Sequence, residues 1–312
     1  MTDRRIAFVY PGQGSQYPGM SAALAAAWPE AAARIRAAAE TLRLPELPAV
    51  MADGPDDDLR RTDRTQPALF LVSMLLHEAL AGRGVSPVAV AGHSLGEYVA
   101  LTAAGALTFD AALALVGRRG RLMRDADDGT GAMAAVLGLD DDAVERAVAD
   151  HGAGQVTVAN YNAPGQVVIS GARDALAAVA EALKSAGARR VVSLPVGGAF
   201  HSPMVAGAAA ALAVDLAAAP FRDVAVPVVA NVDGRARTGA EDLRAAATAQ
   251  MTGSVRWTRT MATLTDHLGI NTLVEVGPGA VLTGLAKRSA KGLETFNVAT
   301  PDDVERVAMA LA

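Results

Sequence analysis

The chain has 312 residues and no cysteine. It therefore forms no disulfide, carries no thiol nucleophile and binds no metal through thiolates, which fits a reducing compartment. Basic residues are fewer than acidic ones, 28 against 33, and nonspecific nucleic-acid binding needs a basic surface. At the N-terminus, a charged stretch to Arg5 is followed by only a short apolar run, so the charged-then-long-apolar build of a signal peptide is missing. We expect a cytoplasmic protein that binds no nucleic acid.

One long run lacks charge and resembles a membrane span. Residues 191–214 contain no Asp, Glu, Lys or Arg over 24 positions, which is long enough to cross a bilayer. Pro195, Gly197 and Pro203 interrupt the run, and hydrocarbon would leave such a broken backbone without hydrogen-bond partners. We interpret the run as a buried strand, an irregular loop and a buried helix, and we expect no membrane contact.

Half of the sequence (51%) is hydrophobic, which is enough to fill one large α/β domain or two smaller ones. Residues 133–195 show strand, helix, two strands joined by a Pro-Gly turn, helix and strand. This βαββαβ order is that of a ferredoxin-like subdomain. We predict that the subdomain spans 131–197 and is inserted into a larger α/β domain formed by 1–130 and 198–312.

In the larger domain, short apolar runs bounded by turn residues predict buried strands, and longer amphipathic runs predict helices. The first strand ends at Pro11, and Pro67 stands at a position that the start of a helix tolerates well. An Asp-rich stretch between two helices is predicted to be a loop. The predicted strands are 5–10, 88–91, 226–232 and 272–277, the helices are 21–43, 67–82 and 95–104, and the polar loop is 52–66.

A G-x-S-x-G sequence at residues 92–96 places Ser94 between two glycines. A predicted strand precedes it and a predicted helix follows, which is the context that a nucleophilic serine on a tight turn requires. The helix N-terminus would stabilise an oxyanion that forms beside this serine. The alternative is a simple strand–helix turn with an unreactive serine, but the flanking strand and helix favour a nucleophile.

A serine nucleophile needs a base, and five histidines are candidates. His201 lies in the loop GGAFHSP inside the uncharged run, and an imidazole with a pKa near 6.5 suits a base at neutral pH. The alternative for His201 is a buried, hydrogen-bonded core residue. His93 adjoins Ser94 and is expected to point away from it, while His77, His151 and His267 are expected at the surface.

Arg119 stands out among the arginines of its predicted helix. Its neighbours three and four positions away, Leu115, Val116, Leu122 and Met123, are all apolar. A guanidinium on such a face is costly to bury without an anion. That anion is either a carboxylate of the protein or the carboxylate of a substrate gripped by two hydrogen bonds.

The loop PGQGSQ follows the first predicted strand and carries Gln13. Open α/β sheets place ligand-binding groups at the carboxyl ends of their strands. The loop matches neither the P-loop pattern nor the G-x-G-x-x-G spacing, so it is no phosphate cradle of a usual kind.

Taken together, these motifs make the chain resemble the bacterial malonyl-CoA:acyl-carrier-protein transacylases, a family of acyltransferases of fatty-acid and polyketide synthesis. The resemblance extends over nearly the whole chain and is most specific in PGQGSQ and GHSLGEY. It implies an α/β-hydrolase-like domain with an inserted ferredoxin-like subdomain. The matching motifs are PGQGSQ, TQPALF, AGHSLGEY, RRGRLM, GTGAMAAVLGL, NYNAPGQVVISG, GAFHSPM, VRWT and VEVGPGAVLTGL.

The resemblance implies a ping-pong reaction without a cofactor or metal. Ser94 would take a malonyl group from malonyl-CoA and pass it to the phosphopantetheine thiol of an acyl carrier protein. His201 would be the base, and Arg119 would hold the malonyl carboxylate. We expect a monomer that meets its acidic carrier protein transiently through charge.

Four further residues receive roles from the resemblance. The backbone N–H groups of Gln13 and Leu95 would form the oxyanion hole, and the main-chain carbonyl of Gln250 would orient the histidine. Phe200 would favour malonyl over methylmalonyl units. The motif GAFHSP resembles the corresponding motif of polyketide enzymes more than that of some enzymes of fatty-acid synthesis. Both pathways therefore stay open.

Two other functions compete with malonyl transfer. A serine esterase or thioesterase would use the same turn with an acidic partner, and a noncatalytic carrier-docking module would leave Ser94 inert. Either an acyltransferase or a docking module would need a local basic surface for an acidic carrier. The candidates for it are Arg118, Arg121, Arg124, Arg189, Arg190, Lys287, Arg288 and Lys291.

Overall fold

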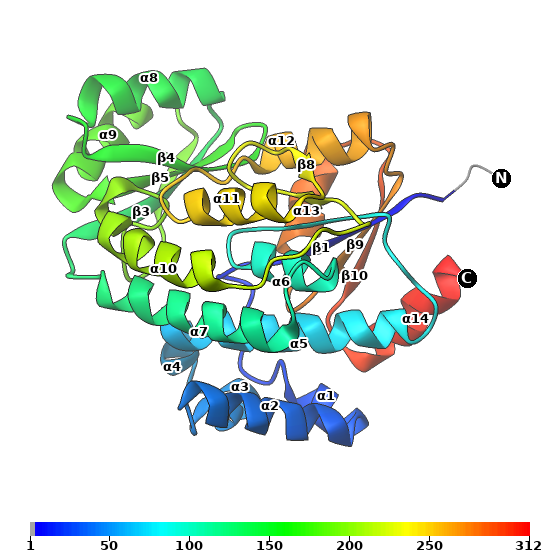
Figure 1. Cartoon of the computed structure of the whole chain (residues 1–312). Coiled ribbons are helices and arrows are strands. Elements are labelled where there is room, and N and C mark those ends of the chain that lie inside the picture. The colour runs from blue at the N-terminus through cyan, green and yellow to red at the C-terminus, as the bar shows by residue number, and fades with distance from the viewer. Residues whose placement is uncertain (1–3) are drawn as a thin grey trace.

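The structure is a computed structural model that describes residues 4–312, and two β-sheets organise it (Figure 1). The larger sheet has the strand order β10-β9-β1-β2-β7-β8, in which β8 runs antiparallel to β7 and the other neighbours are parallel. The carboxyl ends of parallel strands lie at one edge of the sheet. The polar residues of the site described below lie at this edge. The strands are β1 (Ile6–Tyr10), β2 (Ala89–Gly92), β7 (Val228–Val229), β8 (Ala236–Arg237), β9 (Thr272–Val276) and β10 (Glu294–Val298).

The larger sheet is buried on both faces because its central strands are continuously apolar. In β1, Phe8 and Tyr10 join the core on one face, whereas Ala7 and Val9 join the core on the other. Most helices cover the first face, and α12 and α13 cover the second (Figure 1). Helices on the first side are α1 (Ala22–Ala27), α2 (Pro29–Leu42), α3 (Leu47–Asp53), α4 (Asp56–Arg60), α5 (Thr62–Ala81), α6 (Gly96–Ala103), α7 (Phe109–Asp125) and α14 (Pro301–Leu311).

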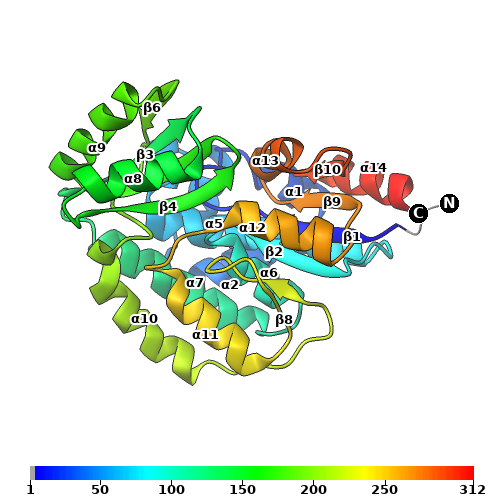
Figure 2. The ribbon, with the colours of Figure 1, turned by 90° about the horizontal axis from the view of Figure 1, so that it is seen from above.

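The smaller sheet lies at one end of the molecule, with α8 and α9 packed on it (Figure 2). Its elements follow the order β3, α8, β4, β5, α9, β6, and its antiparallel strands are ordered β4-β5-β3-β6. The structure is therefore an α/β fold with one mixed and one antiparallel sheet. The bounds are β3 (Gly131–Leu137), α8 (Asp141–His151), β4 (Val156–Ala163), β5 (Gln166–Ala172), α9 (Arg173–Ser185) and β6 (Arg190–Ser193).

The chain returns from the smaller sheet through α10, which lies beside both α7 and α11. In the uncharged run the loop and helix are present, but β6 is partly exposed rather than buried because it is an edge strand. No helix among residues 4–312 is both long and apolar enough to cross a membrane. The remaining helical segments are η1 (Pro203–Val205), α10 (Ala206–Ala218), α11 (Ala240–Gln250), α12 (Trp257–Ala262), η2 (Thr263–His267) and α13 (Val281–Ser289).

Several predicted boundaries are wrong, each for a local reason. The helix expected at 21–43 is two helices, because Trp28 adopts an extended conformation before Pro29 opens α2. The polar loop expected at 52–66 contains α4, whose aspartates favour the positive end of a helix dipole. Helix α5 already begins at Thr62, so Pro67 lies inside it. The strand expected at 226–232 has only the two residues of β7, and β8 and β10 were not predicted.

Candidate active site

Ser94 lies on a sharp turn between β2 and α6, at the carboxyl edge of the larger sheet. Its φ angle is +51°, a left-handed conformation that is strained for a residue with a Cβ. The flanking glycines are sterically required: a Cβ on Gly92 would collide with the backbone of Gly96, and a Cβ on Gly96 with the carbonyl of Tyr10. The G-x-S-x-G sequence therefore forms the tight strand–helix turn that it predicts.

The Ser94 hydroxyl lies 2.8 Å from Nε2 of His201. The other ring nitrogen of His201, Nδ1, lies 3.1 Å from the Gln250 carbonyl oxygen and 3.0 Å from that of Gly253. Carbonyl oxygens only accept, so Nδ1 carries the proton and Nε2 is free to accept one from Ser94. No carboxylate of the described chain forms an ion pair with this histidine.

His201 is buried, and its pKa is lowered to about 3. Desolvation is the main cause, and the nearby positive charge of Arg119 lowers the pKa further. The imidazole is therefore neutral at physiological pH and ready to accept a proton. Its backbone φ is +56°, a second left-handed residue at the site, so the loop holds this ring in a strained position.

Arg119 of α7 is only 1% exposed. Its guanidinium donates to Oε1 of Gln66 at 2.9 Å, to Oε1 of Gln250 at 3.1 Å and to the Ser94 hydroxyl at 3.2 Å. All three partners are uncharged, and Nε of Arg119 has no hydrogen-bond partner. Among residues 4–312 no carboxylate lies within ion-pair distance of Arg119. The buried Glu97 interacts with it electrostatically at longer range, so the guanidinium has no acid in direct contact and can bind a ligand carboxylate.

The loop after β1 brings Gln13 to the same edge as Ser94. Gly12 packs so closely on the His93 carbonyl that a Cβ there would collide with it, and Gln13 Nε2 donates to Thr62 Oγ1 at 3.3 Å. The backbone N–H groups of Gln13 and Leu95 donate to no group in the described part of the chain. Both residues line the site, so two free donors are available beside Ser94.

These groups line one cavity of about 90 Å³ that lies between the two sheets. Its polar side carries Ser94, His201, Arg119 and Gln13, which come from four separate segments of the chain. Such a mixture of apolar wall and converging polar groups is typical of a small-molecule site. The apolar wall consists of Leu95, Met123, Met133, Leu194, Val196 and Phe200, of which Met133 belongs to the smaller sheet.

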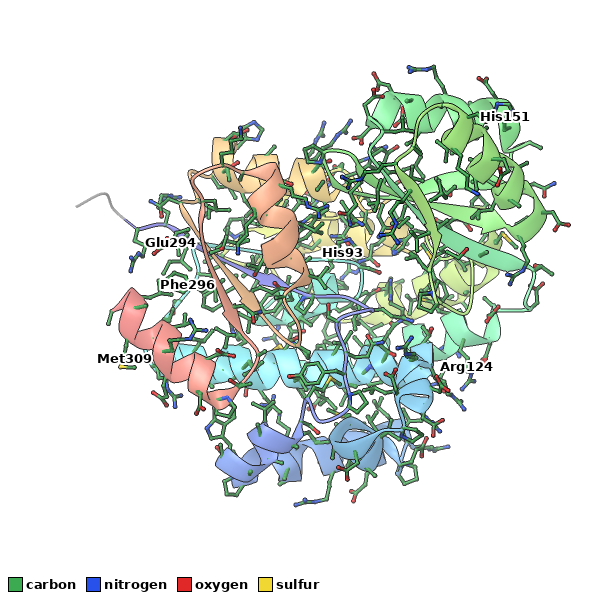
Figure 3. The ribbon with its side chains drawn as sticks, turned by 180° about the vertical axis from the view of Figure 1, so that it is seen from behind. His93, Arg124, His151, Glu294, Phe296 and Met309 are labelled. Atoms are coloured by element: carbon green, nitrogen blue, oxygen red, sulfur yellow. The ribbon has the colours of Figure 1, made fainter. Side chains whose placement is uncertain are left out.

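No other histidine among the described residues forms a hydrogen bond with the Ser94 hydroxyl, although His93 lines the same cavity. His93 Nε2 bonds instead to Oδ1 of Asn162 at 2.8 Å. His151 and His267 are exposed, as predicted, and Figure 3 shows His151 on the outer face of α8. The prediction for His77 is wrong: it is partly buried, and its Nδ1 lies 2.9 Å from the Tyr10 hydroxyl, which joins α5 to β1.

Several residues of the site carried no signal in the sequence. Gln66, Asn231, Gly253 and the side chain of Gln250 reach the site through the fold. Among residues 4–312, no cluster of three or more His, Asp or Glu side chains is arranged to hold a metal ion. The basic candidates differ in their surroundings: Arg118 and Arg124 form ion pairs, while Arg189, Arg190, Lys287, Arg288 and Lys291 are exposed and Arg121 is partly buried.

Comparison with known proteins agrees with this geometry. The model of the acyl transferase domain family matches residues 7–307. The chain is 43% identical to the malonyl CoA-acyl carrier protein transacylase of Escherichia coli strain K12 over 91% of this chain and 92% of that protein. It is 39% identical to the corresponding Bacillus subtilis protein, over 96% of this chain and 95% of the relative.

Solved structures are equally similar. An acyl carrier protein S-malonyltransferase from Vibrio cholerae superposes with a TM-score of 0.92 at 42% identity, over 97% of this chain and 99% of that one. A malonyl-transacylase solved with its type II PKS acyl-carrier protein gives a TM-score of 0.93 at 39% identity, over 98% and 99%. The chain belongs to the acyl transferase family and groups within it with the malonyl-CoA–acyl carrier protein transacylases.

Proposed function

We propose that this protein is an acyltransferase that moves a malonyl group from malonyl-CoA to the phosphopantetheine thiol of an acyl carrier protein. The observation that carries the proposal is one cavity in which Ser94, a neutral His201 and an Arg119 without a carboxylate partner meet. No other described residues combine a nucleophile, a base and an unpaired buried cation. The relatives are named malonyl CoA-acyl carrier protein transacylases, which supports this reaction, and the family resemblance implies that it feeds fatty-acid synthesis.

In the first half-reaction, the Ser94 oxygen attacks the thioester carbonyl while Nε2 of His201 takes the hydroxyl proton. The backbone N–H groups of Gln13 and Leu95 stabilise the oxyanion. The C–S bond then breaks, and His201 returns the proton to the CoA sulfur, which leaves a malonyl ester on Ser94. In the second half, the carrier thiol gives its proton to His201 and attacks the ester carbonyl. The bond from that carbon to the Ser94 oxygen then breaks, and His201 returns the proton to the serine oxygen, which leaves the malonyl group on the carrier thiol.

His201 works here with carbonyl groups instead of an acid. The carbonyl oxygens of Gln250 and Gly253 hold Nδ1–H and stabilise the imidazolium that forms in each half-reaction. The Arg119 charge opposes that imidazolium, because it lowers the pKa of His201. A malonyl carboxylate bound to Arg119 offsets this charge, so the base becomes stronger when the correct substrate is bound.

Arg119 also selects the substrate. A bidentate contact between its guanidinium and a free carboxylate stabilises malonyl groups in a buried setting, and acetyl groups lack that carboxylate. Phe200 lines the same cavity, where its ring limits the space beside the malonyl methylene group. This is the basis on which we assign Phe200 to the discrimination against methylmalonyl units.

Two related functions are distinguished by specific features. A serine hydrolase would usually have a carboxylate hydrogen-bonded to Nδ1 of the catalytic histidine. In this protein Nδ1 of His201 lies beside two main-chain carbonyl oxygens instead, which favours a transferase. Malonyl transfer to a polyketide acyl carrier protein is the second candidate. The motif GAFHSP favours this function, as does the similarity to the transacylase solved with its type II PKS acyl-carrier protein.

The division of the chain follows from the same proposal. We assign residues 131–197 to a ferredoxin-like subdomain, since β3 to β6 have its βαββαβ order. Residues 1–130 and 198–312 then form an α/β-hydrolase-like domain that carries the turn at Ser94. The basic residues named in the sequence are assigned to carrier docking. A monomeric state, a cytoplasmic location and the lack of a cofactor stay predictions.

Mass measurement of the intact protein tests the proposal directly. Incubation with malonyl-CoA should add one malonyl group to the wild type and none to Ser94→Ala, whereas acetyl-CoA and methylmalonyl-CoA should add much less. Addition of holo acyl carrier protein should clear the adduct faster than water does. Labelling of Ser94→Ala, or loss of the adduct at one rate with and without carrier, would contradict the proposal.

A further inference from the structure

Asn231 has no part in the reaction above, although it contacts both sides of the Ser94 turn. It lies two residues beyond β7, which pairs with β2, and it is completely buried. Its side-chain Oδ1 accepts the backbone N–H of Ser94 at 2.8 Å, and its Nδ2 donates to the Gly92 carbonyl at 2.7 Å. One side-chain amide therefore bridges the turn from the residue before His93 to the residue after it.

The backbone of Asn231 is itself held in place. Its N–H donates to Oε2 of Glu97 at 2.8 Å, and its carbonyl accepts the N–H of Arg256 at 2.8 Å. Glu97 belongs to the first turn of α6, directly after the Ser94 turn, and is 2% exposed. The turn, Glu97 and Asn231 thus form a closed ring of hydrogen bonds inside the protein.

The Ser94 residue needs such support because its backbone is strained. At a φ of +51° it lies outside the regular hydrogen-bond ladder of the sheet, and side chains support its peptide groups. Its N–H donates to Oδ1 of Asn231 at 2.8 Å, and its carbonyl accepts from Nε2 of Gln250 at 2.7 Å and from the backbone N–H of Glu97 at 3.1 Å. The next N–H, that of Leu95, is the one left free beside the cavity.

We propose that Asn231, anchored by Glu97, is a positioning residue that holds the Ser94 backbone so that its hydroxyl reaches His201 while the Leu95 N–H stays free for the oxyanion. This inference rests on the proposed function. Without the amide, the buried Ser94 N–H loses its partner, and the strained turn relaxes towards another conformation. A displacement of the hydroxyl by about 1 Å lowers the rate of such a reaction by about 10²-fold.

The test measures the single-turnover rate of malonyl-Ser94 formation, by rapid quench and intact mass, together with KM for malonyl-CoA. Asn231→Ala should lower the rate about 10²-fold with KM within about threefold, because binding groups stay in place. Asn231→Asp keeps an oxygen for the Ser94 N–H and should be at least about tenfold faster than Asn231→Ala. The matched control is Asn297→Ala, which removes another amide bonded to a backbone carbonyl and should retain the wild-type rate.

The outcomes distinguish a failure of the positioning role of Asn231 from a failure of the proposed function. A wild type that forms no adduct contradicts the function itself. Wild-type rates in Asn231→Ala, or equally slow Asp and Ala variants, overturn the positioning role. If Asn231→Ala does not fold, the same ring is tested through Glu97, since Glu97→Gln keeps an acceptor for the Asn231 N–H and should acylate at least about tenfold faster than Glu97→Ala. Equal rates in those two variants also overturn it.

Discussion

Helix α7 carries arginines in two contrasting environments. Arg118 and Arg124 are 44% and 40% exposed, and each meets a carboxylate, that of Asp215 at 3.3 Å and that of Asp63 at 2.6 Å. Arg119, between them, is 1% exposed and meets only uncharged partners. Figure 3 shows Arg124 at the edge of the molecule. The exposed arginines each pair with a carboxylate although water already stabilises their charge, whereas the buried Arg119 has no carboxylate in direct contact.

This contrast indicates that a buried arginine without a carboxylate partner marks the binding site of an anionic ligand. A charge in water gains little from a partner, whereas a buried charge without one carries a large desolvation cost. The neutral oxygens of Gln66 and Gln250 reduce that cost for Arg119 without cancelling its charge. The remaining attraction is available to a substrate carboxylate, which is the physical basis of the proposed malonyl selectivity.

The largest effect is expected from removal of the buried charge. Arg119→Ala should lower kcat/KM for malonyl-CoA about 10²- to 10³-fold, since a buried charge pair is worth about 3–4 kcal/mol. Acylation by acetyl-CoA should fall much less, so the preference between the two substrates collapses. Initial rates with both thioesters measure this, and a retained malonyl preference would remove Arg119 from its role.

A smaller loss of malonyl-CoA binding is expected when a carboxylate is placed beside Arg119, as one already lies beside Arg124. Gln66→Glu places a carboxylate at the position of the Gln66 oxygen, 2.9 Å from the guanidinium, where it competes with the substrate. KM for malonyl-CoA should rise about tenfold, because the charge is already neutralised. Gln66→Met removes the amide without adding a charge and should raise KM less. Equal KM values in the two variants would show that competition is not the cause.

The buried acid Glu97 should make stability depend on pH in the opposite sense to the ion-paired Asp63, whose pKa, despite burial, is lowered by Arg61 and Arg124. Burial raises the pKa of Glu97 from 4.5 to about 7, so ionisation of the folded protein costs stability that grows as pH rises from 4.5 to 7. Glu97→Gln should therefore be more stable than the wild type at pH 8, by about 1–3 kcal/mol, and by much less at pH 5. Urea unfolding at both values measures this, and a destabilised variant at pH 8 would refute it.

The smallest effect belongs to the exposed arginine. Arg118→Ala removes an ion pair whose two side chains are each 44% exposed. The free energy of unfolding should change by less than about 1 kcal/mol, and less still at high salt. Thermal unfolding at low and high ionic strength is the measurement. A loss of several kcal/mol would mean that this exposed ion pair stabilises the fold much more than its exposure implies.

Much of the fold was predictable because its signals are local. The strands β1, β2 and β9 and the order of elements from β3 to β6 follow from apolar runs and turn residues. The short strands β7 and β8 were not separable by pattern, because two residues carry no periodicity. Helix α4 was missed since aspartates are equally common in loops and in first turns of helices.

The residues of the site also fall into those with a local signal in the sequence and those without one. Ser94 was identifiable from its glycines, and Arg119 from its apolar neighbours, because each signal lies within a few positions of the residue. Asn231 and Gly253 were not identifiable, because their roles depend on partners more than 100 and about 50 positions away.

By itself, the sequence determined the strained serine turn, the buried face of α7 and the family to which the chain belongs. These depend on steric limits and on helical spacing, which act over short distances along the chain. Only the tertiary structure decided that a second carbonyl, that of Gly253, would reach His201, that Arg119 would have no acid in direct contact and that Asn231 would support Ser94. Such contacts join segments that are distant in the chain, and the parallel strands bring them to one edge.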